Sequence, residues 1–337
     1  MPSSEEPRAP ELHELLACPA CAGALREPRA DHQALRCTAC SALYAAPDGI
    51  PSLRHPADPR TERVRTFYGE APFPGYRPRD TLHALRARAE ASPLARMLDQ
   101  AIPEDARVLD LGCGTGQMTL FLAREQRLLV GADLTRASLA LARTAARRFG
   151  VARALFVETD LRRPGLRPAA FDVVVCLGVL HHTPDPRAAF AAVAKLIRPG
   201  GMLVIGLYNA IARLPHRLRR LVARLSGMRL LLADPVLRER RCEPERRRAW
   251  LRDQYLHPEE HRHTLGEVQR WFRENEIDYV RTVPPALLGA DPLAEAALFT
   301  PIEDDWWLER MACQLGWMVT LGAEGGLFVT LGRRRQT

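Results

Sequence analysis

The feature that most constrains this chain is a glycine-rich turn at the end of an apolar strand. The segment V-L-D-L-G-C-G-T-G-Q places Gly112, Gly114 and Gly116 directly after apolar residues. Glycine has no Cβ, so the backbone can turn sharply there and approach a ligand closely. A strand that ends in such a turn is typical of an α/β fold that binds its ligand at the carboxyl ends of the strands.

Strands and helices alternate through the middle of the chain. This alternation predicts an α/β, doubly wound sheet whose strands are mostly parallel, with helices on both faces. The strand candidates are residues 107–111, 128–132, 154–157, 171–177 and 202–207, and the helix candidates between them are 117–124, 137–149 and 186–197.

The spacing of the glycines argues against a nicotinamide dinucleotide. The fingerprint G-x-G-x-x-G fails, because its third glycine would be Gln117 when counted from Gly112 and Thr119 when counted from Gly114. A nucleoside ligand still needs an acid for its ribose hydroxyls at the end of the second strand. Asp133 stands there, 21 residues after Gly112.

The motifs around this turn resemble those of class I S-adenosylmethionine-dependent methyltransferases over about residues 106–207. The resemblance rests on D-L-G-C-G-T-G, followed in order by F-V-E-T-D-L, V-V-V-C-L-G-V-L-H-H and R-P-G-G. It implies a Rossmann-like sheet with an antiparallel last strand and S-adenosylmethionine as the cofactor. The alternative, a doubly wound domain with an idle glycine turn, must treat these motifs as coincidence.

The resemblance also implies roles for individual residues. Asp110 and the glycine loop would lie at the methionine end of the cofactor, Asp133 at the ribose and Asp160 at the adenine amino group. The complete set of implied cofactor residues is Asp110, Gly112, Cys113, Gly114, Gly116, Gln117, Asp133, Leu134, Asp160, Leu161, Leu177 and Gly178.

Two histidines, His181 and His182, follow the fourth strand where a methyl acceptor would approach. Methyl transfer is an in-line attack on a sulfonium methyl, so a protein mainly positions the reactants and supplies a base only when the acceptor must lose a proton. Either histidine is a candidate for that base; alternatively, it closes the pocket or caps the next turn. The Asn/Asp-Pro-Pro-aromatic motif and the Pro-Cys nucleophile of many nucleic-acid methyltransferases do not occur here.

Four N-terminal cysteines have the spacing of a zinc site. Cys18-x-x-Cys21 and Cys37-x-x-Cys40 are separated by fifteen residues, and two such pairs complete a tetrahedral thiolate cage for Zn²⁺. A redox pair or chance spacing is the alternative. Residues 11–54 resemble the zinc ribbon of the small activator subunit of methyltransferases, which implies a structural zinc. The remaining cysteines lack ligand spacing and are predicted to be buried thiols: Cys113, Cys176, Cys242 and Cys313.

The positive charge of the chain is concentrated in one segment. Lys195 is the only lysine among the 48 basic residues, a skew typical of GC-rich coding and weak support for nucleic-acid binding. Residues 206–252 carry thirteen arginines and four acids, a net charge of +9 against +8 for the whole chain. The longest apolar run, 173–180, is far short of the roughly 18 residues of a membrane span. Acids at the N-terminus do not fit a signal peptide, so we expect a cytoplasmic protein.

Two insertions are predicted near the end of the sheet. A capping box of Thr264 and Glu267 begins the last helix of the sheet, which leads into a sixth strand at 277–283, and 326–333 is predicted as the last strand. The predicted organisation is a zinc ribbon at 1–54, a connector with a helical and aromatic cap at 55–105, and a methyltransferase domain at 106–337 with insertions at about 208–263 and 284–325.

The first insertion contains a basic amphipathic helix at about 211–229. One stripe is apolar and a second is formed by Arg213, Arg217, Arg220 and Arg224. The simplest interpretation is that the apolar stripe packs on the domain and the arginines are solvated. The alternatives are contact with an anionic membrane surface, with RNA, or with an acidic protein or substrate.

Aromatic side chains before the domain and in the first insertion are candidates for an acceptor pocket. They are Phe67, Tyr68, Tyr76, Tyr208, Tyr255 and His257; His261 and His263 add a possible second metal site, and Trp306 and Trp307 are predicted to cover the acceptor or anchor their loop. The favoured function is methylation of a small molecule or metabolite in a covered pocket. An RNA methyltransferase is the alternative, because the basic segment would suit phosphates. A non-catalytic interaction scaffold is the third hypothesis.

Overall fold

The structure is a computed structural model. It describes residues 10–28, 33–55, 58–72, 75–77, 79–229, 231, 234–239, 243–287, 298–302, 306–322 and 325–336. Cys242, one of the predicted buried thiols, lies outside these ranges.

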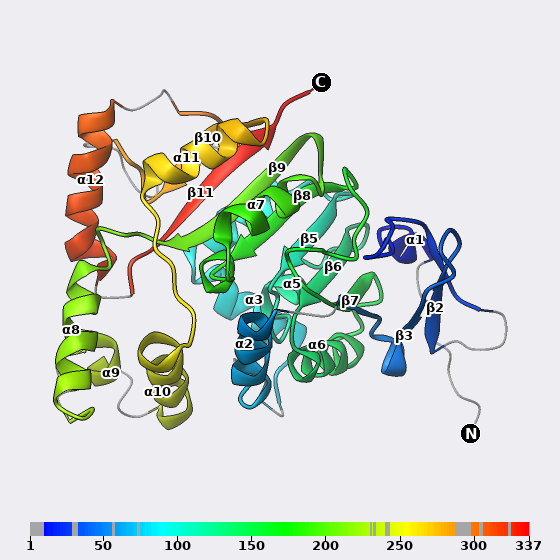
Figure 1. Ribbon diagram of the computed structural model, residues 1–337, viewed down its shortest axis with the longest axis horizontal. Helices are drawn as coiled ribbons and strands as arrows, with labels where there is room; N and C mark the ends of the chain where they lie inside the picture. The colour runs from blue at the N-terminus through cyan, green and yellow to red at the C-terminus, as the bar shows by residue number, and fades with distance from the viewer. Residues whose placement is uncertain are drawn as a thin grey trace.

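An eight-stranded sheet forms the centre of the molecule (Figure 1). Its order is β10-β11-β9-β8-β5-β6-β7-β4, and β11 is antiparallel to both neighbours while the other pairs are parallel. The predicted doubly wound sheet with an antiparallel last strand is therefore confirmed. The strands are β4 (Ser52–Leu53), β5 (Arg107–Leu111), β6 (Leu128–Asp133), β7 (Ala154–Thr159), β8 (Phe171–Leu177), β9 (Ile197–Tyr208), β10 (Ile277–Val283) and β11 (Leu327–Arg334).

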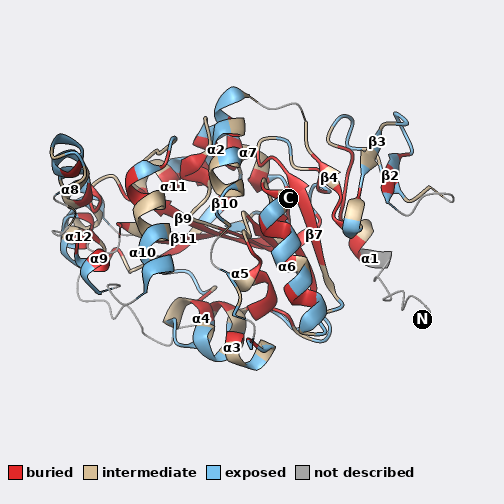
Figure 2. Ribbon diagram, turned by 90° about the horizontal axis from the view of Figure 1, so that it is seen from below, coloured by how far each residue is buried: buried red, intermediate tan, exposed pale blue. Residues whose placement is uncertain are grey.

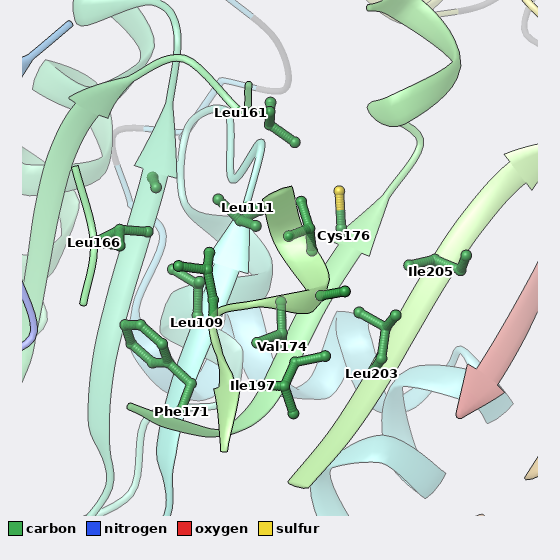
Figure 3. Close-up of a cluster of buried hydrophobic side chains, with 14 of the residues drawn as sticks. Leu109, Leu111, Leu161, Leu166, Phe171, Val174, Cys176, Ile197, Leu203 and Ile205 are labelled. Atoms are coloured by element: carbon green, nitrogen blue, oxygen red, sulfur yellow. The ribbon is translucent and has the colours of Figure 1, made fainter. Parts of the chain in front are cut away.

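Helices bury both faces of this sheet. Along β5, Leu109 and Leu111 point into a cluster with α7 and α11, whereas Val108 points into a cluster with α4 and α5. Figure 3 shows the first cluster, where leucine and valine side chains from neighbouring strands meet. Successive strand residues alternate between faces, so a strand buried on both sides must be apolar throughout. The covering helices are α3 (Leu82–Glu90), α4 (Pro93–Ala101), α5 (Gln117–Phe121), α6 (Arg136–Arg148), α7 (Pro186–Ala194) and α11 (Leu265–Glu274).

The N-terminal module joins the central sheet through a strand. Its own sheet has the order β1-β2-β3 and is antiparallel. The next strand, β4, pairs in parallel with β7, with Ser52 opposite Glu158. The predicted division at residue 54 thus falls directly after a strand of the central sheet. The elements before β4 are α1 (Pro10–His13), β1 (Leu25–Arg26), β2 (Ala34–Cys37), β3 (Leu43–Ala45) and the 3-10 turn Pro47–Gly49.

Two arginines of α6 hold the turn that precedes β4. Arg136 donates to the carbonyl oxygen of Pro47 at 2.6 Å, and Arg143 donates to that of Gly49 at 2.9 Å. Leu16 and Leu53 belong to the same buried cluster as the central strands. The N-terminal module and the larger domain therefore share one hydrophobic core.

A helix that the sequence analysis missed begins inside the predicted connector. Helix α2 (Pro59–Gly69) starts after Asp58, whose side chain accepts from the backbone N–H of Arg60 at 2.7 Å. An aspartate N-cap followed by proline at the first helical position is a favoured start. The predicted cap at 55–105 also contains α3 and α4, which are separate helices because Ser92 before Pro93 has an extended backbone.

The described helices of the two insertions lie at the end of the molecule opposite the N-terminal module (Figures 1 and 2). They are α8 (Leu214–Leu225), α9 (Pro235–Glu239), α10 (Pro244–Leu251), the π-helical turn η5 (Arg252–Leu256) and α12 (Trp307–Thr320). Among the described residues, no helix is both long and apolar enough to cross a membrane.

Helix α8 differs from its prediction in length and in orientation. It is shorter than 211–229 because the Asn209 side chain accepts from the N–H groups of Ile211 and Ala212 before it, and positive φ angles at Gly227 and Met228 follow it. The prediction that its apolar stripe packs on the domain is wrong. That stripe is exposed, and Arg213, from the predicted solvated stripe, is fully buried.

Candidate cofactor and acceptor site

A cavity lies at the carboxyl ends of the central strands, where the fold predicts a ligand. Eight of the twelve predicted cofactor residues line it: Gly112, Gly114, Asp133, Leu134, Asp160, Leu161, Leu177 and Gly178. Other lining residues come from α2, from α6 and the turn before it, and from the turn after β8: Thr61, Val64, Tyr68, Thr135, Ser138, Val179, His182, Thr183 and Pro184.

The glycines of this cavity are required by their backbone and by close neighbours. Gly112 has a φ of +72°, and a Cβ there would lie 2.2 Å from Cγ2 of Val179. Gly178 has a φ of +76° and open space where its Cβ would be. The backbone at these two positions therefore forms a cradle that larger residues would strain or fill.

Asp133 is held at the end of β6 and keeps capacity for a ligand. Its Oδ1 accepts from the backbone N–H and the hydroxyl of Thr135, at 2.8 and 2.6 Å, and its Oδ2 accepts from the N–H of Gly114 at 2.9 Å. A carboxylate oxygen has about two acceptor positions, so Oδ2 can accept one further hydrogen bond. Burial raises the pKa of Asp133 above its usual range, and the hydrogen bonds from Thr135 oppose this rise. The group suits a ribose hydroxyl.

Asp160 lies after β7 and is buried, whereas Asp133 is half-buried. Its Oδ1 accepts from the backbone N–H of Arg162 at 2.9 Å, and its Oδ2 pairs with the Arg162 guanidinium at 3.1 Å. These contacts fix the carboxylate at the cavity wall, where an amino group of a ligand can donate to it.

Four predicted cofactor residues do not line the cavity: Asp110, Cys113, Gly116 and Gln117. Asp110 accepts from the Thr119 hydroxyl at 2.6 Å beneath the glycine loop, and burial raises its pKa to about 6. Gln117 donates to the carbonyl oxygen of Gly75 at 3.2 Å, and the Tyr76 hydroxyl donates to that of Thr115 at 2.7 Å. Gln117 and Tyr76 thus hold the aromatic segment against the glycine loop.

Tyr68, from α2, and His182, from the turn after β8, also line the cavity. The Tyr68 hydroxyl donates to Oδ1 of Asp253 at 3.0 Å, and the Tyr208 hydroxyl contacts the other carboxylate oxygen at 3.3 Å. Asp253 belongs to the first insertion, so this carboxylate connects α2 to that insertion. Sequence reasoning missed Asp253 because its partners are distant along the chain.

His181 lies behind this wall rather than on it. It is fully buried, its ring centroid is 3.8 Å from that of Tyr208, and in the described part of the chain neither of its ring nitrogens has a hydrogen-bond partner. His257 stacks on His182 with ring centroids 3.7 Å apart, but it lines a different pocket. These two rings position His182 and do not reach the cavity.

The remaining aromatic candidates have other contacts. Phe67 packs against His257 and Tyr68, and Tyr255 donates to Asp234 at 2.7 Å in a separate small cluster. Trp306 and Trp307 are exposed and do not line the cavity. Thr61 and Val64 were missed, although with Tyr68 they follow a helical i, i+3, i+7 spacing.

The four predicted zinc ligands meet in one cluster. Their sulfur atoms lie within 4.8 Å of one another, with Cys18 and Cys40 at 3.7 Å and Cys21 and Cys37 at 3.5 Å. Zn–S bonds of about 2.3 Å in a tetrahedron put the sulfurs about 3.8 Å apart, so the donor set fits a structural zinc ion. Within the described ranges it is the one group of three or more such side chains that fits a metal. His261 and His263 instead contact Glu259 and Glu267 at 3.0 Å.

Replacing Asp133 with alanine is expected to weaken S-adenosylmethionine binding at least tenfold. Hydrogen bonds to a charged group are worth ~1.5–3 kcal/mol, and the variant removes the acceptor for the ribose hydroxyls. Calorimetric titration measures the effect. The exposed Asp105→Ala variant is the control, and Asp160→Ala should weaken binding less. Wild-type affinity in Asp133→Ala would contradict the assignment of this strand end.

Comparison with known proteins agrees with both parts of the structure. The family described as "Methyltransferase domain" matches residues 109–205, and the family described as "Trm112p-like protein" matches residues 9–49. An uncharacterized protein of Synechococcus, syc1184_c, is 31% identical over 214 residues, which cover 55% of this chain and 51% of that protein. A protein of Sodalis glossinidius named ubiquinone biosynthesis O-methyltransferase is 38% identical over 102 residues, 30% of this chain and 41% of that protein. The chain thus spans about half the length of the curated relatives it matches.

A solved structure from Rickettsia typhi, PKMT2, shares the fold. It has a TM-score of 0.53 and 17% sequence identity, and the match covers 73% of this chain and 52% of that one. The strand order, the cavity at the strand ends and the two family matches agree with one another. The chain thus joins a segment that matches the Trm112p-like family, residues 9–49, to a segment that matches the methyltransferase-domain family, residues 109–205.

Proposed function

We propose that this chain transfers the methyl group of S-adenosylmethionine to a small molecule enclosed in the cavity. One observation carries the proposal: the cavity that holds the glycine loop, Asp133 and Asp160 also contains Tyr68 and His182. The first group suits the cofactor and the second suits an acceptor. The hydrogen bond from Tyr68 to Asp253 ties α2, which lines the cavity, to the first insertion. A cavity wall held in this way would help to exclude water from the reacting groups.

S-adenosylmethionine supplies an electrophilic methyl group when bound. The chain's part is to bind and orient: Asp133 would hold the ribose, Asp160 the adenine amino group, and Leu177 and Gly178 the region of the sulfonium. Tyr68 is kept in place by Asp253. Correct placement of two reactants accounts for a large part of the acceleration of such in-line transfers.

His182 is the candidate base for an acceptor that loses a proton. Its Nδ1 lies 2.8 Å from the carbonyl oxygen of Glu259. A carbonyl can only accept, so Nδ1 carries the hydrogen in the neutral ring and Nε2 remains the acceptor. Burial lowers the pKa of His182 below its ordinary value of 6.5, which keeps the ring neutral near pH 7. Nε2 would take a proton from a hydroxyl acceptor as its oxygen attacks the methyl group.

The proposed acceptor carries a hydroxyl group. The Sodalis relative is named as an O-methyltransferase, and a neutral imidazole is the base that such an oxygen needs. The matched family region ends at residue 205. Tyr68 and Asp253 lie outside it and His182 lies inside it, so the proposed acceptor side combines one residue of the shared core with residues from outside it.

The proposal is tested by following methyl label from S-adenosylmethionine into a panel of small phenols and into total RNA. We expect label in a small acceptor. His182→Gln should lower its turnover by roughly 100- to 10,000-fold, the range for loss of general-base catalysis, with little change in cofactor affinity. The exposed His83→Gln variant is the control.

The pH profile gives a second measurement. Because the pKa of His182 is lowered, the neutral base persists below pH 6.5, and the fall of turnover on the acid side should lie below that value. A His182→Gln variant with wild-type turnover would remove the base assignment. Label only in RNA would favour the RNA methyltransferase, and failure to bind S-adenosylmethionine would favour the non-catalytic scaffold.

A further inference from the structure

Helix α8 turns its apolar side to solvent. Leu218 is 63% exposed and Leu225 is 79% exposed, whereas Ala223 and His216 on another side of the helix are buried. The exposed apolar residues recur at three- and four-residue steps: Leu214, Leu218, Leu221, Val222 and Leu225. A helix of a globular protein normally directs such a stripe inward, so this one is left without a partner in the part of the chain that the structure describes.

Helix α12 presents a second exposed apolar stripe at the same end of the molecule. Its members follow one another at intervals of four residues: Trp307, Met311, Leu315 and Val319. Val319 is 82% exposed. Figures 1 and 2 show α8 and α12 together, far from the zinc ribbon. Arg219 of α8 donates to the carbonyl oxygen of Gly322, just after α12, at 2.7 Å. We call these two stripes the α8–α12 face.

A basic pocket adjoins the α8–α12 face. It is lined by Arg217, Arg220, Arg224 and Arg262, and also by Leu221, which is part of the face. We call it the arginine pocket. Its lining includes one acid, Glu260, which is already paired with Arg213 and Arg220 at 2.9 Å.

The arginine pocket has unused capacity for an anion. Among the described residues, the guanidinium groups of Arg217, Arg224 and Arg262 have no hydrogen-bond or ion-pair partner. Burial and the neighbouring Arg217 charge lower the pKa of Arg262. His216 and His257 in the wall are buried and each has one ring nitrogen without a partner. Clustered arginines of this kind bind phosphate oxygens well.

We propose that the α8–α12 face binds the surface of an anionic phospholipid bilayer, with lipid phosphates in the arginine pocket. An apolar stripe flanked by arginine is the pattern of a helix that lies in the plane of the membrane interface. Tryptophan favours the level of the lipid headgroups. RNA, or a protein segment that is acidic throughout, would satisfy the arginines but would leave the leucines of α8 in water. The combination therefore selects a lipid surface.

Vesicle flotation with the full chain tests the proposal. We expect binding to vesicles of phosphatidylcholine and phosphatidylglycerol, much weaker binding to phosphatidylcholine alone, and a decrease in binding as salt screens the charges. The triple variant R217Q/R224Q/R262Q should bind the anionic vesicles on the order of 100-fold more weakly, since each arginine near such a surface contributes a factor of about five. The matched control R26Q/R96Q/R273Q removes three exposed charges elsewhere and should bind like the wild type.

A second variant separates the apolar contribution from the charge. L218S/L225S/V319S keeps all arginines and changes side chains that are already exposed, so folding and S-adenosylmethionine binding should be unaltered. It should lose at least tenfold in vesicle affinity.

Three results would overturn the proposal. In the first, the wild-type chain does not float with anionic vesicles. In the second, the matched control R26Q/R96Q/R273Q loses as much vesicle affinity as R217Q/R224Q/R262Q. In the third, L218S/L225S/V319S keeps the vesicle affinity of the wild type. The pocket would instead be assigned to RNA if the chain bound single-stranded RNA at micromolar affinity with a marked salt dependence. In that case the slope of log affinity against log salt should fall by about 0.7 for each of the three arginines removed.

Discussion

Replacing Arg213 with methionine is expected to destabilise the chain by about 3–5 kcal/mol, because the change breaks a buried ion pair and leaves Glu260 with only its ion pair to Arg220. Arg213 is fully buried, and its guanidinium donates twice to Glu260, at 2.9 and 3.1 Å. It also donates to Gln254 at 2.8 Å and to the Gly325 carbonyl oxygen, and it stacks 3.6 Å above the ring of Tyr208. One side chain thus connects four separate segments.

Urea unfolding measures this loss, and Arg217→Met on the same helix is the matched control. Arg217 is exposed, so its replacement should change stability by less than about 0.5 kcal/mol. The double variant R213M/E260Q should recover part of the loss, because it also removes the buried charge that has lost one of its two cations. Equal unfolding midpoints for Arg213→Met and Arg217→Met would show that the buried pair is not required.

The same pair makes the first insertion sensitive to acid. Burial alone would raise the pKa of Glu260, but the hydrogen bonds and charge of Arg213 lower it to about 2. A carboxylate with a depressed folded-state pKa stabilises the fold above its unfolded value, here 4.5, and loses that contribution as the pH falls toward 2. The wild type should therefore lose stability across this range, and R213M/E260Q should lose less.

Removal of zinc, or a Cys37→Ser change, is expected to unfold the N-terminal module and to weaken the methyltransferase domain with it. A small module folded around zinc gains on the order of 10–16 kcal/mol from the metal. Leu16, Leu53 and Cys37 belong to the same buried cluster as the central strands. Loss of the module therefore exposes part of the domain core, and the melting temperature of the whole chain should fall.

Metal analysis, thermal melting and calorimetry of S-adenosylmethionine binding test this effect. The wild type should carry one zinc per chain and Cys37→Ser none. Cofactor affinity should also fall, because β4 pairs with β7 immediately before Asp160. Cys313→Ser, the same chemical change in the core but outside the four-cysteine site, is the control for metal content and cofactor affinity. A zinc-free chain with unchanged melting and cofactor affinity would show that the two domains are independent.

The central strands were predictable because a strand that is buried on both faces has a continuous apolar sequence. The predicted limits of 107–111 and 171–177 coincide with β5 and β8. Each is a short apolar run next to a turn, which is the typical sequence of a strand in a parallel sheet that helices bury on both faces. The glycine-rich turn and the acid at the end of β6 predicted the position of the cavity, because the carboxyl ends of parallel strands meet at one edge of the sheet.

Helix α2 and the orientation of α8 were not predictable from local pattern. In α2, Thr61 and Val64 are buried among charged neighbours, and Glu62 is held by Arg65 and Arg54, so no clear apolar stripe appears. In α8 the periodicity defined a stripe but not the side that meets the domain. That side is fixed by Glu260, which is 47 residues from Arg213. Long-range ion pairs leave no periodic signal.

Strand β4 has a consequence for how the sheet behaves at low protein concentration. The outer edge of a terminal strand carries unpaired backbone groups that can recruit strands from other molecules. Here β4 covers part of the β7 edge, with the N–H of Glu158 donating to the carbonyl oxygen of Pro51 at 2.9 Å. Because β4 belongs to the same chain, this pairing is intramolecular and does not weaken on dilution, as the docking of a separate subunit would. At any protein concentration, β4 therefore covers the same part of the β7 edge.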